Sequence, residues 1–203
     1  VSMTEHFAAI GANYEREVHI FEVNPSTGLF AESPVATING YYEHANFGGS
    51  VAIDGDFMIV GASLAAKAFI FARVAATNTW DTVACANFDA YTLYDGFGSS
   101  VAISDDFAIV GAPGVAKAFI FSRNSVSGWS STAVTIIDGY TNEIDFGMSV
   151  AINGHSAIVG APGAGKAFTF AFNVGSNTWN KVADAVFTNH MDEVGFGYGV
   201  AIS

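Results

Sequence analysis

The sequence has few basic residues and no long apolar segment. Lysine and arginine together number 7 against 19 aspartate and glutamate residues, which gives a net charge of −12. The phosphate backbone of DNA or RNA repels so acidic a chain, and we therefore expect no nucleic-acid partner. Glycine or a polar residue interrupts every apolar run well before the roughly 20 residues that a membrane-spanning helix needs. We also expect no insertion into a membrane.

Cysteine is almost absent as well. The single Cys85 excludes an internal disulfide framework, although it does not exclude secretion. It lies in the apolar run VACANF, and we expect it to be buried there as a small hydrophobic residue. The acidity and the shortage of lysine favour an extracellular or cell-surface protein. Because the chain starts at Val1 and shows no signal peptide, we expect a mature or excised piece of a longer product.

Two further patterns are missing. The three-to-four-residue period of an amphipathic helix does not occur, so we expect an all-β protein. The sequence also has no His-Glu-x-x-His motif, no nucleophile–histidine–acid grouping and no metal-ligand spacing among its five histidines. We interpret the chain as non-enzymatic.

What the sequence does contain is an internal repeat. Residues 97–121 read FGSSVAISDDFAIVGAPGVAKAFIF, and close copies occupy residues 47–71 and 146–170. The opening Phe-Gly recurs at steps of 50, 49 and 50 residues, the last time at Phe196. The first 50 residues are a diverged copy of the same unit. We therefore expect one repeat domain with units at 1–50, 51–100, 101–149 and 150–199, and with the start of a further unit at 200–203.

Each unit carries four strand signals. In the second complete unit they are residues 100–103, residues 107–112, residues 117–122 and a segment after Trp129. The first two are apolar at nearly every position, which indicates a sheet covered on both faces. Their side chains are also small, so neighbouring sheets can approach closely. Four-stranded antiparallel sheets packed face to face around an axis are the blades of a β-propeller.

The segments Phe-Gly-x-Ser-Val-Ala and Val-Gly-Ala-Pro resemble FG-GAP repeats, which occur in the propeller of integrin α chains and in secreted or surface proteins of bacteria and protists. The resemblance covers essentially the whole chain and is closest to the secreted type with repeats of about 50 residues. It implies a seven-bladed propeller or a longer array, and an adhesion or interaction module that is rarely a catalyst. The signature residues that carry it are Phe47, Gly48, Phe97, Gly98, Phe146, Gly147, Phe196 and Gly197, together with Gly61, Gly111 and Gly160.

The integrin-type repeat holds calcium in an Asp-x-Asp-x-Asp-Gly loop between its first two strands. Here that connection is only two or three residues long, at residues 54–56, 104–106 and 153–155. Calcium needs about six to eight oxygen ligands, which so short a hairpin cannot supply. We do not transfer the calcium site to this chain, and we expect no cofactor.

Two columns of residues form the candidate binding surface. The first is aromatic and stands beside the outermost strand, where rings cover the gap between blades or serve as platforms for sugars and partner proteins. The second lies in the loops before each Phe-Gly, on the face where propellers bind ligands; its alternative is a solvated loop. The first column is Trp80, Trp129 and Trp179, and the second is Tyr41, Tyr91, Tyr140, Glu43, Asp95, Glu143 and Asp192.

A third column consists of Lys67, Lys117 and Lys166, at the start of the third strand of three units. We expect each lysine to pair with a nearby carboxylate along its blade, and the alternative is a cationic rim that faces a ligand.

Three functions fit these patterns. The favoured one is a non-enzymatic extracellular module for structure or adhesion, which binds other proteins or the cell surface through its loops and outer edges. The second is a subunit of an extracellular filament that joins copies of itself head to tail, because residues 1–4 and 200–203 represent the same strand. The third is a lectin-like propeller that binds surface glycans or a cation.

Overall fold

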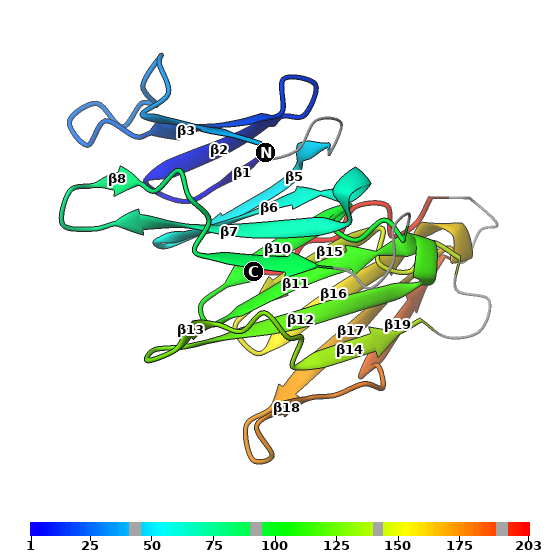
Figure 1. Ribbon diagram of the computed structural model, residues 1–203. Helices are drawn as coiled ribbons and strands as arrows, with labels where there is room; N and C mark the ends of the chain where they lie inside the picture. The colour runs from blue at the N-terminus through cyan, green and yellow to red at the C-terminus, as the bar shows by residue number, and fades with distance from the viewer. Residues whose placement is uncertain (41–45, 90–94, 140–143, 190–194) are drawn as a thin grey trace.

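The computed structural model describes residues 1–203 except 41–45, 90–94, 140–143 and 190–194. It contains four separate antiparallel sheets (Figure 1). The first sheet holds β1 (Ser2–Met3), β2 (Phe7–Ala12), β3 (Glu17–Glu22) and β4 (Ala36–Asn39). The second holds β5 (Phe47–Asp54), β6 (Phe57–Ala62), β7 (Lys67–Val74), β8 (Thr79–Trp80) and β9 (Ala86–Asp89).

The remaining two sheets repeat the second one. One holds β10 (Ser100–Ser104), β11 (Phe107–Ala112), β12 (Lys117–Asn124), β13 (Gly128–Trp129) and β14 (Thr135–Asp138). The other holds β15 (Ser149–Asn153), β16 (Ser156–Ala161), β17 (Lys166–Asn173), β18 (Thr178–Trp179) and β19 (Ala185–Thr188). Among the described residues the only helical turns are the short η1 (Ser63–Ala65), η2 (Pro113–Val115) and η3 (Pro162–Ala164). The prediction of an all-β protein is confirmed.

Within each sheet the four principal strands follow one another as a meander, and each pairs with the next. Tight turns join the first two strands, and residues with positive φ such as Gly55 (φ 52°) and Asp105 (φ 52°) close them. The Gly-Ala-Pro segment ends the second strand, because Pro113 starts a 3₁₀ turn in place of a further ladder residue. The predicted strand 107–112 is observed without change, and the third strand extends two residues beyond the prediction.

The tryptophans lie in an element that the sequence did not predict. Trp80, Trp129 and Trp179 sit in two-residue strands that pair with the last residues of the third strand. A loop then leads to the fourth strand, which pairs with the beginning of the third strand. Each tryptophan is therefore an outer extension of its blade and not the start of its last strand.

The hydrophobic core is divided among the interfaces between neighbouring sheets. Strand β11 illustrates this, since Ile109 and Val110 point to opposite faces and both are fully buried. Ile109 belongs to the cluster shared with the fourth sheet, and Val110 to the cluster shared with the second sheet. Covered sheet faces, as predicted from continuous apolarity, are confirmed for this strand.

The signature phenylalanines anchor these clusters. Phe97 is fully buried and meets Phe119 and Phe121 of the following unit edge to face, with ring centroids 5.2 and 6.3 Å apart. Phe47 and Phe146 are also fully buried and repeat the arrangement. Each such aromatic pair stabilises the fold by about 0.5–1.5 kcal/mol beyond the contribution from burial of apolar area.

The signature glycines allow the backbones of neighbouring units to touch. Gly111 lies so close to the backbone that leads into the fourth sheet that an added Cβ would stand 1.9 Å from the carbonyl oxygen of Gly147. Gly147 itself has a φ of 92°, a conformation that strains any other residue. The Ser100 hydroxyl donates a hydrogen bond of 2.8 Å to that same carbonyl. Equivalent serines at Ser50 and Ser149 donate to Gly98 and Gly197 at 2.7 Å each.

A second set of contacts joins the units at the opposite end of the inner strands. The backbone N–H of Asp105 donates to the Asp54 carboxylate at 2.8 Å, and that of Gly154 donates to the Ser104 hydroxyl at 3.0 Å. The inner strands are thus linked near both of their ends by hydrogen bonds that recur once per unit.

Gly111→Ala tests the importance of the close approach between units. We expect the substitution to lower the free energy of unfolding by about 1–3 kcal/mol or more, because the methyl group forces two backbones apart. Urea unfolding followed by tryptophan fluorescence measures the effect. Gly175→Ala is the matched control, since its new Cβ meets nothing nearer than the Asn173 Oδ1 at 3.3 Å. Equal stability of the two variants would contradict the interpretation.

Candidate functional site

The same arrangement of aromatic side chains occurs at the outer edge of three interfaces between neighbouring blades. Each tryptophan packs edge to face on the hairpin phenylalanine of the preceding sheet. The ring centroids are 5.7 Å apart for Trp80 and Phe7, and 5.2 Å apart for Trp179 and Phe107. Trp80 and Trp179 are only 6% and 3% exposed. Of the two roles expected for these residues, the structure favours covering the gap between blades over binding, because their rings are buried in that gap.

Trp129 is the half-buried member of the column. Its ring meets Phe57 of the preceding sheet at 5.7 Å. The indole nitrogens of all three tryptophans are buried without a hydrogen-bond partner among the described residues. Because the unpartnered indole nitrogen occurs at all three interfaces, it does not mark any one of them as a binding site.

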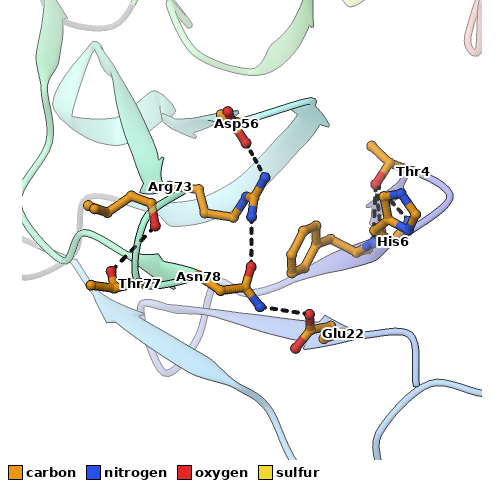
Figure 2. Close-up of polar contacts among 9 residues, drawn as sticks. Thr4, His6, Glu22, Asp56, Arg73, Thr77 and Asn78 are labelled. Atoms are coloured by element: carbon orange, nitrogen blue, oxygen red, sulfur yellow. Dashed lines mark hydrogen bonds and ion pairs between the residues drawn. The ribbon is translucent and has the colours of Figure 1, made fainter. Parts of the chain in front are cut away.

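A chain of polar contacts closes the outer edge between the first two sheets (Figure 2). The Arg73 guanidinium lies over the Phe7 ring, 5.3 Å from its centroid, and pairs with Asp56. It also donates to the Asn78 side chain at 2.6 Å. Asn78 in turn donates to Glu22 of the first sheet at 2.9 Å.

The next interface keeps the central part of this arrangement. Arg123 lies 4.6 Å from the centroid of the Phe57 ring, and its Nη2 is 2.6 Å from the Asp106 carboxylate. An aspartate on the hairpin, an arginine on the third strand and a phenylalanine of the preceding sheet therefore form a repeated closure.

The third interface, between the β10–β14 and β15–β19 sheets, departs from the pattern. Phe172 occupies the arginine position and His155 the aspartate position, and their rings stack at 5.0 Å with an angle of 30°. Ser122 stands where the first interface has Glu22. A cavity of about 420 Å³ opens here. It is lined by Asp106, Phe107, Ser122, Arg123, Asn124, Val134, Thr135, His155, Phe172, Asn177, Thr178 and Trp179.

Most of the predicted loop column lies outside the described residues. Those positions are Tyr41, Glu43, Tyr91, Tyr140, Glu143 and Asp192. Asp95 is described, and it is only 5% exposed. Its carboxylate accepts a hydrogen bond of 2.9 Å from the Phe97 N–H, and its backbone carbonyl accepts one of 2.8 Å from Gly114. As an exposed binding residue Asp95 is a wrong prediction, because it fixes the turn that leads into the Phe-Gly segment.

Two of the three lysines in the predicted column pair with a carboxylate of their own blade, as expected. Lys67 pairs with Asp89 and Lys117 with Asp138, each across neighbouring strands of its own sheet. Such exposed pairs contribute about 0–1 kcal/mol. In the last sheet the position opposite Lys166 is Thr188.

Comparison with known families identifies the repeat. A family model described as FG-GAP repeat matches residues 39–71 and 91–128. The chain is an FG-GAP repeat protein. The matched segments contain Phe47, Gly61, Phe97 and Gly111, the residues that bring neighbouring FG-GAP units into contact. No curated protein matches the sequence.

Solved structures share the β-propeller-like fold of the FG-GAP chain. A protein from Desulfotomaculum acetoxidans described as functionally unknown aligns with a TM-score of 0.63 and 14% identity, over 96% of this chain and 56% of its own. A protein from Lactobacillus plantarum aligns with a TM-score of 0.62 and 8% identity, over 95% and 56%. A protein from Bacteroides fragilis described as a candidate 6-phosphogluconolactonase gives 0.60 and 12%, over 91% and 54%.

At these identities the likeness concerns the fold alone. The FG-GAP chain spans a little more than half the length of each of these structures. The four sheets are blades of a β-propeller-like fold, and the seven-bladed ring that the resemblance implies stays a prediction.

Neither a metal cluster nor a membrane helix occurs in the part of the FG-GAP chain that the structure describes. No group of three His, Cys, Asp or Glu side chains there is placed to hold a metal ion. None of the helical turns in that part has the length and apolarity to span a bilayer.

Sequence reasoning missed the cavity between the third and fourth FG-GAP units. Its signal is present in the aligned units, since Thr135 stands where the other three have Ala36, Ala86 and Ala185. Only the observed register places this position on the face that points toward the next blade.

Cys85 is exposed, so its predicted burial is wrong. The strand starts one residue later, at Ala86, and Cys85 lies in the preceding loop with its N–H bonded to the Ile70 carbonyl at 2.8 Å. Protein atoms nevertheless remove part of the hydration of the thiol. This desolvation, with a smaller contribution from the charge of Asp81, raises the pKa of Cys85, although a hydrogen bond between the sulfur and the backbone of Cys85 itself acts in the opposite direction.

The thiol of Cys85 should react without denaturant, and its alkylation should require a higher pH than that of a free thiol. A raised pKa leaves less thiolate at neutral pH, so the midpoint of iodoacetamide alkylation should lie above that of N-acetylcysteine. Mass spectrometry over a pH series measures it, and Asp81→Asn should move the midpoint slightly down. Alkylation that requires unfolding, or a midpoint below that of the free thiol, would contradict the assignment.

Proposed function

We propose that this chain is a non-enzymatic interaction module that acts outside the cell or at its surface. The supporting observation is the set of contacts that the signature residues of the repeat make. Phe97, Ser100, Gly111 and Gly147 are all occupied in joining one unit to the next. These contacts fix how successive units stack, and they leave the outer edges able to differ between units. A rigid scaffold with variable edges is the usual basis of a binding surface.

The alternative from another class is a hydrolase. It has support in two solved structures described as a candidate 6-phosphogluconolactonase and a gluconolactonase, which are 12% and 11% identical to this chain. So distant a likeness transfers no active site, because one fold carries many unrelated functions. We therefore favour binding over catalysis.

Cell binding and lactonase activity separate the two functions. We expect the fluorescently labelled chain to bind intact cells of its source saturably, and we expect protease treatment of those cells to remove the binding. An unrelated protein of similar size and charge is the control, since charge alone produces no saturation. Hydrolysis of 6-phosphogluconolactone at an ordinary enzymatic rate, or the absence of saturable binding, would overturn this proposal.

A specific observation favours self-association as a second function. In the last unit Phe187 is 48% exposed, whereas its counterpart Phe88 is fully buried and stacks on Phe121 of the next unit at 3.8 Å. At the other end of the chain, Met3 and Ile10 of the first sheet are 67% and 39% exposed. The surface that covers Phe88 belongs to a following FG-GAP unit. A second copy of this chain carries such a unit, so head-to-tail association would cover Phe187 in the same way wherever no further unit follows in the same chain.

Phe187→Ser tests this association. We expect the dissociation constant to rise about tenfold to a hundredfold, which corresponds to losing the burial of one large apolar side chain. Sedimentation equilibrium over a concentration series provides the measurement. Val126→Ser is the control, because Val126 is 94% exposed in a loop of the third unit. A chain that stays monomeric at every concentration would refute the idea.

A further inference from the structure

We propose that the cavity between the third and fourth sheets binds one neutral sugar ring of a glycan. The site is a small-molecule cleft at the outer edge, and it does not depend on self-association or on a protein partner. Its volume of about 420 Å³ falls within the range of about 300–1,000 Å³ that ligand sites occupy.

The first step of the argument is Thr135. This residue is only 6% exposed, and it forms part of the cavity wall. The other units place alanine at this register position. In the first two interfaces that alanine packs against the apolar cluster. Thr135 therefore adds a hydroxyl to the cavity wall, and this hydroxyl can donate a hydrogen bond to a ligand or accept one from it.

The second step is the loss of the closure that the other interfaces have. Arginine and aspartate fill the outer edge at the first two interfaces, where the guanidinium covers the hairpin phenylalanine. Phe172 and His155 replace them here. Phe172 is half-buried and meets Phe107 at 5.0 Å with an angle of 52°. The exchange removes a charged bridge and leaves aromatic surface on the wall of the cleft.

The third step is the charge of the lining. Arg123 and Asp106 pair with each other at 2.6 Å, so neither offers an isolated charge. The remaining polar groups are uncharged amides and hydroxyls, and they supply both donors and acceptors. They are Ser122, Asn124, Thr135, Asn177 and Thr178, joined by the His155 ring.

This combination selects the ligand class. Aromatic faces pack against the C–H surface of a sugar ring, and amides and hydroxyls bond its hydroxyl groups in either direction. An anionic ligand is disfavoured because the chain carries a net charge of −12. A cationic ligand finds no unpaired carboxylate in the lining, since Asp106 is the only one there and pairs with Arg123. A neutral, hydroxyl-rich ring fits what remains.

The test uses ligand-observed saturation-transfer NMR and calorimetry on the whole chain. The probes are the methyl glycosides of glucose, galactose, mannose, N-acetylglucosamine and fucose. We expect at least one to bind, and we expect Thr135→Ala to weaken it about threefold to tenfold, as the loss of one hydrogen bond does. The variant should fold normally, because alanine occupies this position in the other three units.

A second variant rebuilds the closed edge. His155→Asp combined with Phe172→Arg restores the pair found at the other two interfaces, and it should abolish binding. Val126→Ser, which lies outside the cleft, should leave the affinity unchanged. The proposal is overturned if no glycoside of the panel binds, or if binding persists unchanged in Thr135→Ala. Equal binding by a folded double variant would overturn it as well.

Discussion

The structure depends on how closely the backbones of successive units approach at the inner strands. Gly111 touches the Gly147 carbonyl, and Ser100 donates a hydrogen bond to the same atom. No side chain separates the two sheets at that point, so their spacing is set by backbone geometry rather than by side-chain volume. The consequence is that units of different sequence still stack at the same distance. The signature of the repeat is therefore a contact between units, and a single unit cannot satisfy it alone.

This constraint explains what the sequence could predict. Residues 107–112 were assigned as a strand with the observed bounds, because a fixed turn precedes them and Pro113 ends the ladder. The stacking of sheets followed from small side chains that are apolar on both faces. The exposure of Cys85 and the short strands that carry the tryptophans were not predicted, for a common physical reason. Their positions depend on a long outer loop whose path is decided by packing on the preceding blade, and no local pattern records that packing.

The cavity was missed for a related reason. Comparison of the aligned units shows Thr135 in a column of alanines. Threonine is common in strands, however, so this difference alone does not predict a cavity. The strand register shows its significance, because it places Thr135 on the same face as Ile137, and this face points toward the fourth sheet. Phe172 is similar, since phenylalanine in place of arginine is informative only once the ring of Phe107 is known to lie beneath it.

The inner and outer edges of the blades are thus under different structural constraints. At the inner edge the same glycine contact occurs in all four sheets and the serine hydrogen bond in three of them, since a single methyl group would separate the sheets. At the outer edge the contacts are made by long side chains that can be exchanged without moving a backbone, as Arg73 and Phe172 illustrate. A change there opens or closes a cavity while the stack stays intact. Divergence between units consequently accumulates where it creates surface chemistry, and the least regular interface of a regular stack is the place to look for a ligand.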